Sequence, residues 1–152
     1  MHRVLVLGAG KIGSLIAGLL EESGDYAVTL ADSRPGAAAE VAAAHQQVGR
    51  GGGIQPLDLD ATRLPDLEAA LRGHRIQAVV SSLPYYCNEL VARAARTTGA
   101  HYFDLTEDVR SATAVFDIAA DASTAFAPQC GLAPGFISIA AAELIRHFQS
   151  VR

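Results

Sequence analysis

Three glycines lie close together near the start of the chain, in the segment Gly8-Ala9-Gly10-Lys11-Ile12-Gly13. In this spacing the first glycine permits a tight turn, the second keeps side-chain atoms away from a pyrophosphate, and the third lets a helix pack closely on a strand. The first N–H groups of a following helix attract an anion. We therefore predict that Gly8, Gly10, Lys11, Ile12 and Gly13 bind the pyrophosphate of a dinucleotide.

Acidic residues lie at the ends of the next two predicted strands. Asp32 comes nineteen residues after Gly13, where it can hydrogen-bond the hydroxyls of an adenosine ribose and would repel a 2′-phosphate, which favours NAD over NADP. Ser33 is predicted to contact the same cofactor. The Arg34 guanidinium could stack on adenine, pair with the 2′-phosphate of NADP, or remain a solvated turn residue. Asp58 could accept a hydrogen bond from the adenine amine, or could serve only as a cap or turn residue.

Further polar residues follow the later strands. Ser81, Ser82 and Pro84 end the fourth strand, where the chain is expected to pass the nicotinamide half of the cofactor. Each of these positions, taken alone, fits an ordinary cap or turn equally well. Because the carboxyl ends of parallel strands share one edge of a sheet, their common position favours a binding site.

Apolar runs and helical patterns alternate along the chain and must position these residues. The pattern predicts strands over 3–7, 27–31, 54–59, 78–82, 101–105 and 125–128, and helices over 14–22, 37–47, 62–72, 88–98, part of 109–123, and 136–148. In the first helix, Leu15, Ile16, Leu19 and Leu20 are predicted to share one apolar face. Alternation with short connections indicates an α/β fold, a doubly wound parallel sheet of the Rossmann type that binds NAD(P).

The composition excludes several other classes of function. The chain has 152 residues, a net charge of −4 and no run of Lys or Arg, which argues against nucleic-acid binding. It has no apolar stretch near twenty residues, and the first strand stands where a signal peptide would be, so neither membrane insertion nor secretion is expected. The two cysteines and five histidines show no metal-ligand spacing. Reduced thiols, a cytoplasmic location and no bound metal are the expectation.

Four segments together resemble the saccharopine dehydrogenase-like family, which includes saccharopine reductase, lysine 6-dehydrogenase and carboxynorspermidine dehydrogenase. They are 8–13, the fourth-strand exit Ser81-Ser82-Leu83-Pro84-Tyr85-Tyr86, the strand Tyr102-Phe103-Asp104-Leu105, and the loop Cys130-Gly131-Leu132-Ala133-Pro134-Gly135-Phe136. The resemblance implies an NAD(P)-dependent oxidoreductase that acts on the C–N bond of an amino acid or opine-type amine. Hydride would pass between the amine-bearing carbon and nicotinamide C4, through an imine.

The resemblance also implies site residues and a second domain. It places Pro84 and Tyr85, and the loop from Cys130 to Gly135, near nicotinamide and substrate. Tyr85, Asp104 and Cys130 are the candidate proton acceptors, and packing or capping roles remain open for each. Family members continue into a domain that contacts the substrate and forms the homo-oligomer interface. We therefore expect residues 1–135 to be the cofactor domain and the apolar helix within 136–152 to lead to that domain, so this chain alone would bind cofactor without turnover.

Three other classes of protein share parts of this pattern. A methyltransferase also binds an adenosine ribose through an acid, but it needs no pyrophosphate-binding helix start. A non-catalytic NAD(H)-sensing regulatory domain would share the glycines and Asp32, but it would not need the loops at Pro84 and Cys130. An interaction module with a vestigial site is disfavoured because the glycines and Asp32 are intact.

Overall fold

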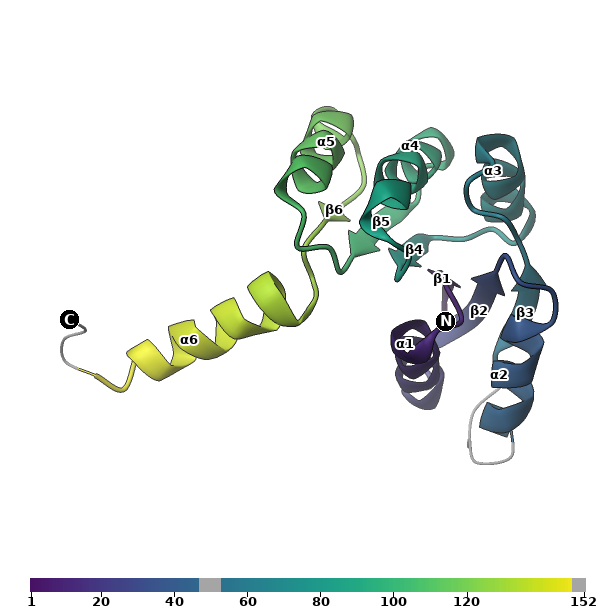
Figure 1. The fold of residues 1–152 in the computed structure, drawn as a ribbon, viewed down its shortest axis with the longest axis horizontal. Helices are drawn as coiled ribbons and strands as arrows, with labels where there is room; N and C mark the ends of the chain where they lie inside the picture. The colour runs from purple at the N-terminus through teal and green to yellow at the C-terminus, as the bar shows by residue number, and fades with distance from the viewer. Residues whose placement is uncertain (47–52, 149–152) are drawn as a thin grey trace.

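The computed structural model describes residues 1–46 and 53–148 and shows one parallel sheet (Figure 1). Its strands are β1 (His2–Leu7), β2 (Tyr26–Asp32), β3 (Gln55–Asp58), β4 (Ala78–Ser81), β5 (His101–Asp104) and β6 (Phe126–Ala127). They lie in the order β3-β2-β1-β4-β5-β6, so the strand order reverses direction beside β1. In such sheets ligands bind at this reversal, beyond the carboxyl ends of the strands.

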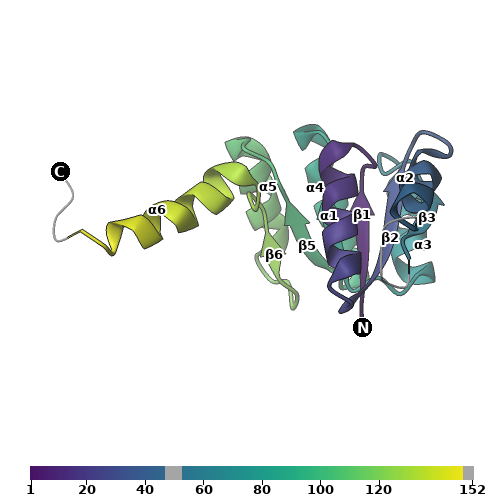
Figure 2. The same cartoon turned by 90° about the horizontal axis from the view of Figure 1, so that it is seen from below.

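Helices cover both faces of the sheet, as Figures 1 and 2 show. On one face lie α1 (Lys11–Glu22) and α2 (Ala37–Gln46). On the other lie α3 (Leu64–Gly73), α4 (Asn88–Thr98) and α5 (Val109–Ala119). The last helix, α6 (Ile137–Ile145), follows the turn η2 (Leu132–Phe136) and leads away from the sheet. The predicted doubly wound α/β fold is confirmed.

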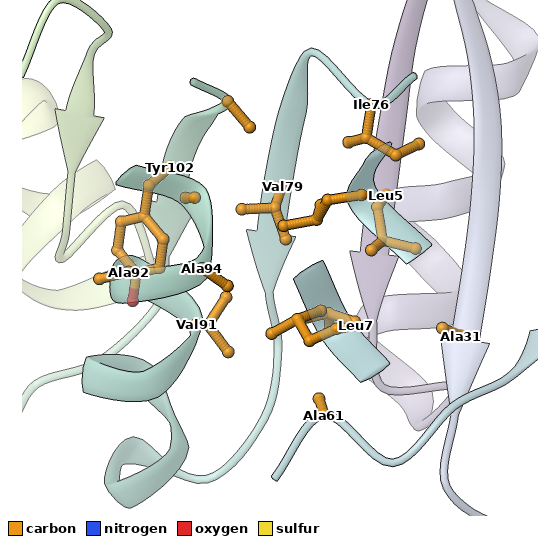
Figure 3. Close-up of a cluster of buried hydrophobic side chains, with 14 of the residues drawn as sticks. Leu5, Leu7, Ala31, Ala61, Ile76, Val79, Val91, Ala92, Ala94 and Tyr102 are labelled. Carbon is orange, nitrogen blue, oxygen red and sulfur yellow. The ribbon is translucent and has the colours of Figure 1, made fainter. Parts of the chain in front are cut away.

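Two apolar clusters hold the helices on the sheet, one on each face. Strand β1 contributes to both, because alternate side chains of a strand point to opposite faces. Leu5 and Leu7 pack with Val79 and Val91 on the α4 side, as Figure 3 shows. Val6 belongs to the cluster on the α1 side. The strand that leads into the glycine turn is therefore held by packing on both of its faces.

The first helix differs from its prediction in two ways. It begins at Lys11 rather than Ser14, because the last residues of the glycine segment already form its first turn. Its buried residues are Gly13, Ala17, Gly18 and Glu21, whereas Leu15 and Leu19 are exposed. The predicted apolar face was right for Ile16 and Leu20, which pack at the edge of the core, and wrong for Leu15 and Leu19, because close packing gives the centre of the buried face to the small residues.

The other boundaries shift by a few residues at strand and helix ends. Helix α4 has its predicted bounds, and Gly99 ends it in the left-handed conformation with φ of 72°. Helix α5 stops at Ala119, earlier than the end of the predicted range, and β6 is shorter than predicted. Gln47, the predicted end of α2, and residues 149–152 of the predicted terminal segment lie outside the described residues.

Candidate functional site

The predicted polar residues meet along the carboxyl edge of the sheet. The strand register pairs Asp32 with Asp58, Leu7 with Ser81, and Ser81 with Asp104. The ends of β3, β2, β4 and β5 therefore present acids and hydroxyls that are far apart in sequence, and the glycine turn after β1 lies between those of β2 and β4. The sequence prediction of one shared edge is confirmed.

The glycine turn forms an open cradle at the start of α1. Gly8 has a φ of 98°, which side chains rarely adopt, and a Cβ on Gly13 would overlap the Gly8 carbonyl oxygen. A Cβ on Gly10 would meet nothing within 4 Å, so the space beside it is open to a ligand. Among the described residues, none caps the start of α1 through its side chain, and no acid lies in its first turn. The free N–H groups and Lys11 therefore suit a pyrophosphate.

Ser82 ties the end of β4 to this cradle. Its Oγ donates to the carbonyl oxygen of Leu7 at 2.8 Å and lies 3.2 Å from that of Gly8. A Cβ on Gly8 would come within 2.8 Å of the same Oγ. The glycine turn thus packs directly against the end of β4, and position 8 has no room for a side chain.

Asp32 is anchored to the glycine turn by its side chain. Its Oδ2 accepts a hydrogen bond from the Ala9 backbone N–H at 2.8 Å, and its Oδ1 accepts from the Arg34 backbone N–H at 2.9 Å. Arg34 Nε lies 3.3 Å from the same Oδ1. Burial alone would raise the pKa of Asp32, but the hydrogen bonds from Arg34 and Ala9 outweigh it and lower the pKa. The side chain is therefore a carboxylate at neutral pH.

A cavity of about 250 Å³ adjoins Asp32 and extends from the glycine turn toward the β4 exit. Of the predicted cofactor residues, Gly8, Asp32, Ser33 and Pro84 line it. Asp60, Thr62 and Tyr86 also line it and were missed, because nothing in their spacing marks them. Asp58 does not line it. Its Oδ1 accepts a hydrogen bond from the Gly36 backbone N–H at 3.0 Å.

The β4 exit carries two exposed tyrosines. Pro84 leads into the short turn η1 (Tyr85–Cys87), where the rings of Tyr85 and Tyr86 meet edge to face with centroids 5.7 Å apart. The Tyr85 residue is 56% exposed. The Ser81 side chain, in contrast, is buried and donates to Asn88 Oδ1 at 2.8 Å. Tyr85 is thus accessible to a ligand, whereas the Ser81 hydroxyl is engaged within the fold.

Asp104 is fully buried and joins β5 to the loop that follows β6. Its Oδ2 accepts from the Tyr102 hydroxyl at 2.6 Å, and its Oδ1 accepts from the backbone N–H groups of Thr106 and Gln129 at 2.9 and 3.0 Å. Burial, the hydrogen bond to Asp104 and its charge raise the pKa of Tyr102 far above its usual value. Sequence reasoning missed Tyr102, Thr106 and Gln129 as partners, since only the fold brings them to one carboxylate.

The same network places Cys130 at the sheet edge. The Cys130 backbone N–H donates to the Asp104 carbonyl oxygen at 2.8 Å, and its thiol is exposed, with Sγ 3.3 Å from the Ala127 carbonyl oxygen. Partial burial and then the Asp104 charge raise the pKa of this thiol. Two glycines pack closely in the rest of the loop. A Cβ on Gly131 would lie 2.8 Å from the Leu105 carbonyl oxygen, and a Cβ on Gly135 would lie 2.8 Å from that of Gln129.

The sheet order, the glycine cradle at its reversal and the acid at the end of β2 define a Rossmann-type dinucleotide-binding domain. A family model described as the saccharopine dehydrogenase NADP binding domain matches residues 4–130. The chain belongs to this family, and its cofactor is NAD(P).

Solved structures share this fold. Saccharopine dehydrogenase (L-Glu forming) from Saccharomyces cerevisiae superposes with a TM-score of 0.81 at 22% identity, over 96% of this chain and 31% of that protein. A putative myo-inositol dehydrogenase from Sinorhizobium meliloti gives 0.62 at 24% identity, over 96% and 42%. UDP-glucose 4-epimerase from Stenotrophomonas maltophila, solved with NAD, gives 0.66 at 17%, over 84% and 52%. The chain thus spans less than a third of the yeast enzyme.

The described residues were searched for membrane-spanning helices and for metal-binding clusters, neither of which the sequence predicts. None of their helices has the length and apolar character needed to cross a membrane. Within the same residues, no three or more His, Cys, Asp or Glu side chains gather where they could hold a metal ion. The oxygen and backbone N–H groups around the open cradle suit a nucleotide.

Proposed function

We propose that this chain is the cofactor-binding part of an oxidoreductase that acts on the C–N bond of an amino acid or opine-type amine. When bound, NAD(P) would supply a hydride donor or acceptor at nicotinamide C4. The residues of this chain would hold the cofactor and orient its nicotinamide half. The proposal is supported by family membership and by the loops that adjoin the cradle.

The main observation behind the proposal is that three loops, the glycine turn, the β4 exit and the Cys130 loop, are hydrogen-bonded to one another or to neighbouring strands at the carboxyl edge of the sheet. Ser82 fastens the β4 exit to the glycine turn, and Asp104 fastens the Cys130 loop to the end of β5. Strands β4 and β5 are neighbours, with Ser81 opposite Asp104. A domain that only senses NAD(H) needs the cradle, but it does not need two further anchored loops beside the nicotinamide half.

The candidate proton acceptors differ in what they can reach. Tyr85 and Cys130 are exposed, so either could contact a substrate amine directly. Asp104 is buried with both carboxylate oxygens already engaged. We propose that Asp104 positions the Cys130 loop and that Tyr85 or Cys130 takes the proton.

The identity of the preferred cofactor follows from Asp32. Its carboxylate stands at the ribose end of the cradle and stays ionised, which disfavours a 2′-phosphate. Arg34, whose side chain is 72% exposed, partly neutralises that charge and could turn toward a 2′-phosphate instead. We propose NAD as the preferred cofactor, and NADP as the one that Arg34 would admit.

The substrate contacts and the homo-oligomer interface of the whole protein are proposed to lie in a further domain, as in the family. The chain covers only 31% of the yeast saccharopine dehydrogenase. On this view residues 1–135 bind the cofactor, α6 leads toward the substrate domain, and this chain alone has no turnover.

Separate fluorescence titrations with NADH and NADPH test the cofactor assignment. We expect saturable binding of NADH with a weaker response to NADPH. Because the substrate contacts are proposed to lie in a further domain, saccharopine, lysine and glutamate are added to the loaded protein that contains both this chain and that domain, and this addition separates the two candidate functions. Substrate-induced changes in nicotinamide fluorescence that Tyr85→Phe abolishes would support the oxidoreductase. Binding of NADH that alters the shape or assembly of the chain, with no response to any amine, would favour the sensing domain.

A further inference from the structure

A polar cavity lies near the amino edge of the sheet, away from the glycine cradle. Its volume is about 260 Å³, and its lining comes from β1, β2, β3 and the segment between α3 and β4. The glycine turn, in contrast, follows the opposite end of β1. Four of the lining residues carry polar side chains, namely Arg3, Thr29, Gln55 and His74. We call these four residues the amino-edge site.

Strand geometry brings three of these side chains to the face of the sheet that α3 and α4 cover. Ala31 belongs to the apolar cluster on that face, and Thr29 precedes it by two residues, so both point the same way. The register places Leu5 and Gln55 on either side of Thr29. Arg3 precedes Leu5 by two residues and shares its face. At this end of the sheet the apolar core therefore gives way to polar side chains.

Thr29 is the most deeply buried residue of the four, with 4% of its surface exposed. Its hydroxyl forms no hydrogen bond with another described residue. Yet no buried side-chain oxygen or nitrogen in residues 1–46 and 53–148 is sealed from solvent without a partner. The Thr29 hydroxyl must therefore open onto the cavity. There it can donate to a ligand, and a bound ligand would satisfy a hydroxyl that the fold leaves unpaired.

The charge around the cavity is positive. Arg3 and His74 line it, and none of its described lining residues is acidic. Neither side chain takes part in an ion pair with a described residue. Two carbonyl groups at the end of α3 are already occupied, because His74 N–H donates to Ala70 and Ile76 N–H donates to Leu71. The cavity therefore offers donors and a cationic side chain without a counter-charge of its own.

These side chains suit a phosphate group. A guanidinium, an imidazole, a hydroxyl and a primary amide can all donate hydrogen bonds, and a guanidinium matches two phosphate oxygens at once. A carboxylate has only two oxygens, so it would leave more of these donors unpaired. The cavity of about 260 Å³ is smaller than the roughly 300–1,000 Å³ of a site for a drug-sized molecule. A compact anion therefore fits it better than a nucleotide does.

We propose that the amino-edge site binds the phosphate group of a small ligand, independently of the dinucleotide. Arg3 supplies the charge, the buried Thr29 hydroxyl fixes the position of one oxygen, and Gln55 and His74 complete the contacts. Thr29 and Asp32 lie three residues apart on β2, which is about 10 Å along a strand. Because the two sites use opposite edges of the sheet, the phosphate and the dinucleotide can be bound together.

Titration of inorganic phosphate into the NADH-saturated chain, followed by NMR of the backbone amides, tests the site. NADH first occupies the glycine cradle, which would otherwise attract phosphate as well. We expect saturable shifts at the amides of the amino-edge site. Sodium chloride at equal ionic strength should not cause them, and sodium acetate should bind more weakly than phosphate. A parallel titration with glycerol 3-phosphate distinguishes the source of the phosphate group, since tighter binding than inorganic phosphate indicates an organic phosphate ester.

Two substitutions test the contacts. Thr29→Val removes the hydroxyl and keeps the shape of the side chain, and Arg3→Gln removes the charge at an exposed residue. Each should weaken phosphate binding by about 10-fold or more and leave NADH affinity unchanged. Thr113→Val and Arg110→Gln make the same chemical changes at exposed residues of α5 and are the matched controls. Circular dichroism verifies the fold of each variant, and Arg3→Gln tests the site by itself if Thr29→Val disturbs the sheet.

Four results would overturn the proposal. They are the absence of saturable shifts at the amino-edge site, shifts confined to the glycine turn, equal weakening by the control variants, and acetate binding as tight as phosphate binding. The second result would mean that phosphate binds only in the cofactor cradle. The last would mean that the cavity accepts any small anion and has no preference for a phosphate group.

Discussion

The carboxylate of Asp32 accepts a hydrogen bond from the backbone N–H of Ala9 at 2.8 Å, so the acid that ends β2 holds the middle of the glycine turn. The Ser82 hydroxyl, after β4, contacts the carbonyl oxygens of Leu7 and Gly8 in the same turn. Hydrogen bonds from both neighbouring strands therefore hold the glycine turn in place. Asp32 shapes the turn, and we propose that it also presents its charge to the ribose of the cofactor.

Replacement of Asp32 by Ala should lower NADH affinity by roughly 10- to 100-fold, since a hydrogen bond to a charged group contributes about 1.5–3 kcal/mol. Titration of nicotinamide fluorescence measures the change. Asp25→Ala is the control, because Asp25 is an exposed turn residue before β2. Equal NADH affinity of the Asp32→Ala variant and the unmodified chain would mean that Asp32 does not bind the ribose.

Replacement of Arg34 by Ala should separate the two cofactors. The Arg34 side chain is exposed and pairs weakly with Asp32 through Nε at 3.3 Å, so its loss should leave NADH binding within about 2-fold. NADPH binding should fall by about 10-fold, because the only counter-charge proposed for a 2′-phosphate is lost. Parallel titrations with both cofactors measure the ratio. Parallel losses for both would indicate that Arg34 stacks on adenine.

Replacement of Gly10 by Leu should abolish cofactor binding while the fold remains intact. The added side chain meets no protein atom near its Cβ, but it enters the space proposed for the pyrophosphate. Gly73→Leu is a matched control, because its Cβ also meets nothing within 4 Å and it lies at the end of α3. Thermal unfolding and NADH titration are measured on both variants. Unchanged NADH binding in Gly10→Leu would place the pyrophosphate elsewhere.

The sequence predicted the cradle well because its parts are local. The glycine spacing, the strand before it and the acid after it lie within 32 residues, and each has its own steric reason. Half of the predicted apolar face of α1, Leu15 and Leu19, is exposed, because the spacing of apolar residues indicates amphipathicity but not which side meets the sheet. Close packing of Gly13 against Gly8 decides that orientation.

The hydrogen bonds that hold the Cys130 loop could not be predicted from the sequence, for a different reason. Gln129 reaches Asp104 over twenty-five positions, and its φ of 65° is set by the loop around it. Nothing in the residue type marks such a contact. Asp104 was predicted as a possible proton acceptor, and that role remains a prediction, alongside the positioning role that its contacts favour.

A buried acid on α1 should make the stability of the fold depend on pH. Glu21 accepts hydrogen bonds from the Gly53 backbone N–H at 2.8 Å and lies 2.9 Å from His45 Nε2 on α2. These two contacts lower the pKa of Glu21. A lowered pKa in the folded state stabilises the fold above pH 4.5, the ordinary value, and that stabilisation is lost as the pH falls through the folded-state pKa.

Replacement of Glu21 by Gln should therefore lower the free energy of unfolding by roughly 1–2 kcal/mol at pH 7, and the difference should shrink below pH 4.5. Urea unfolding at pH 7 and pH 3 measures both values. Glu22→Gln changes the same chemical group at an exposed neighbour and should have little effect at either pH. A difference that persists unchanged at pH 3 would mean that packing, not the charge of Glu21, stabilises this contact.

Replacement of Asp104 by Asn should make Cys130 more reactive. The Asp104 charge contributes to the raised pKa of the Cys130 thiol, so its removal increases the thiolate fraction near pH 8. Alkylation of Cys130 by iodoacetamide, followed by mass spectrometry of the native protein, should accelerate by roughly 2- to 5-fold. Asp121→Asn, which alters an exposed acid, is the control and should leave the rate unchanged. Cys87 is buried and serves as an internal check that the fold stays closed. A slower reaction, or equal acceleration at both cysteines, would show that the Asp104 side chain acts on Cys130 through the loop structure rather than through its charge.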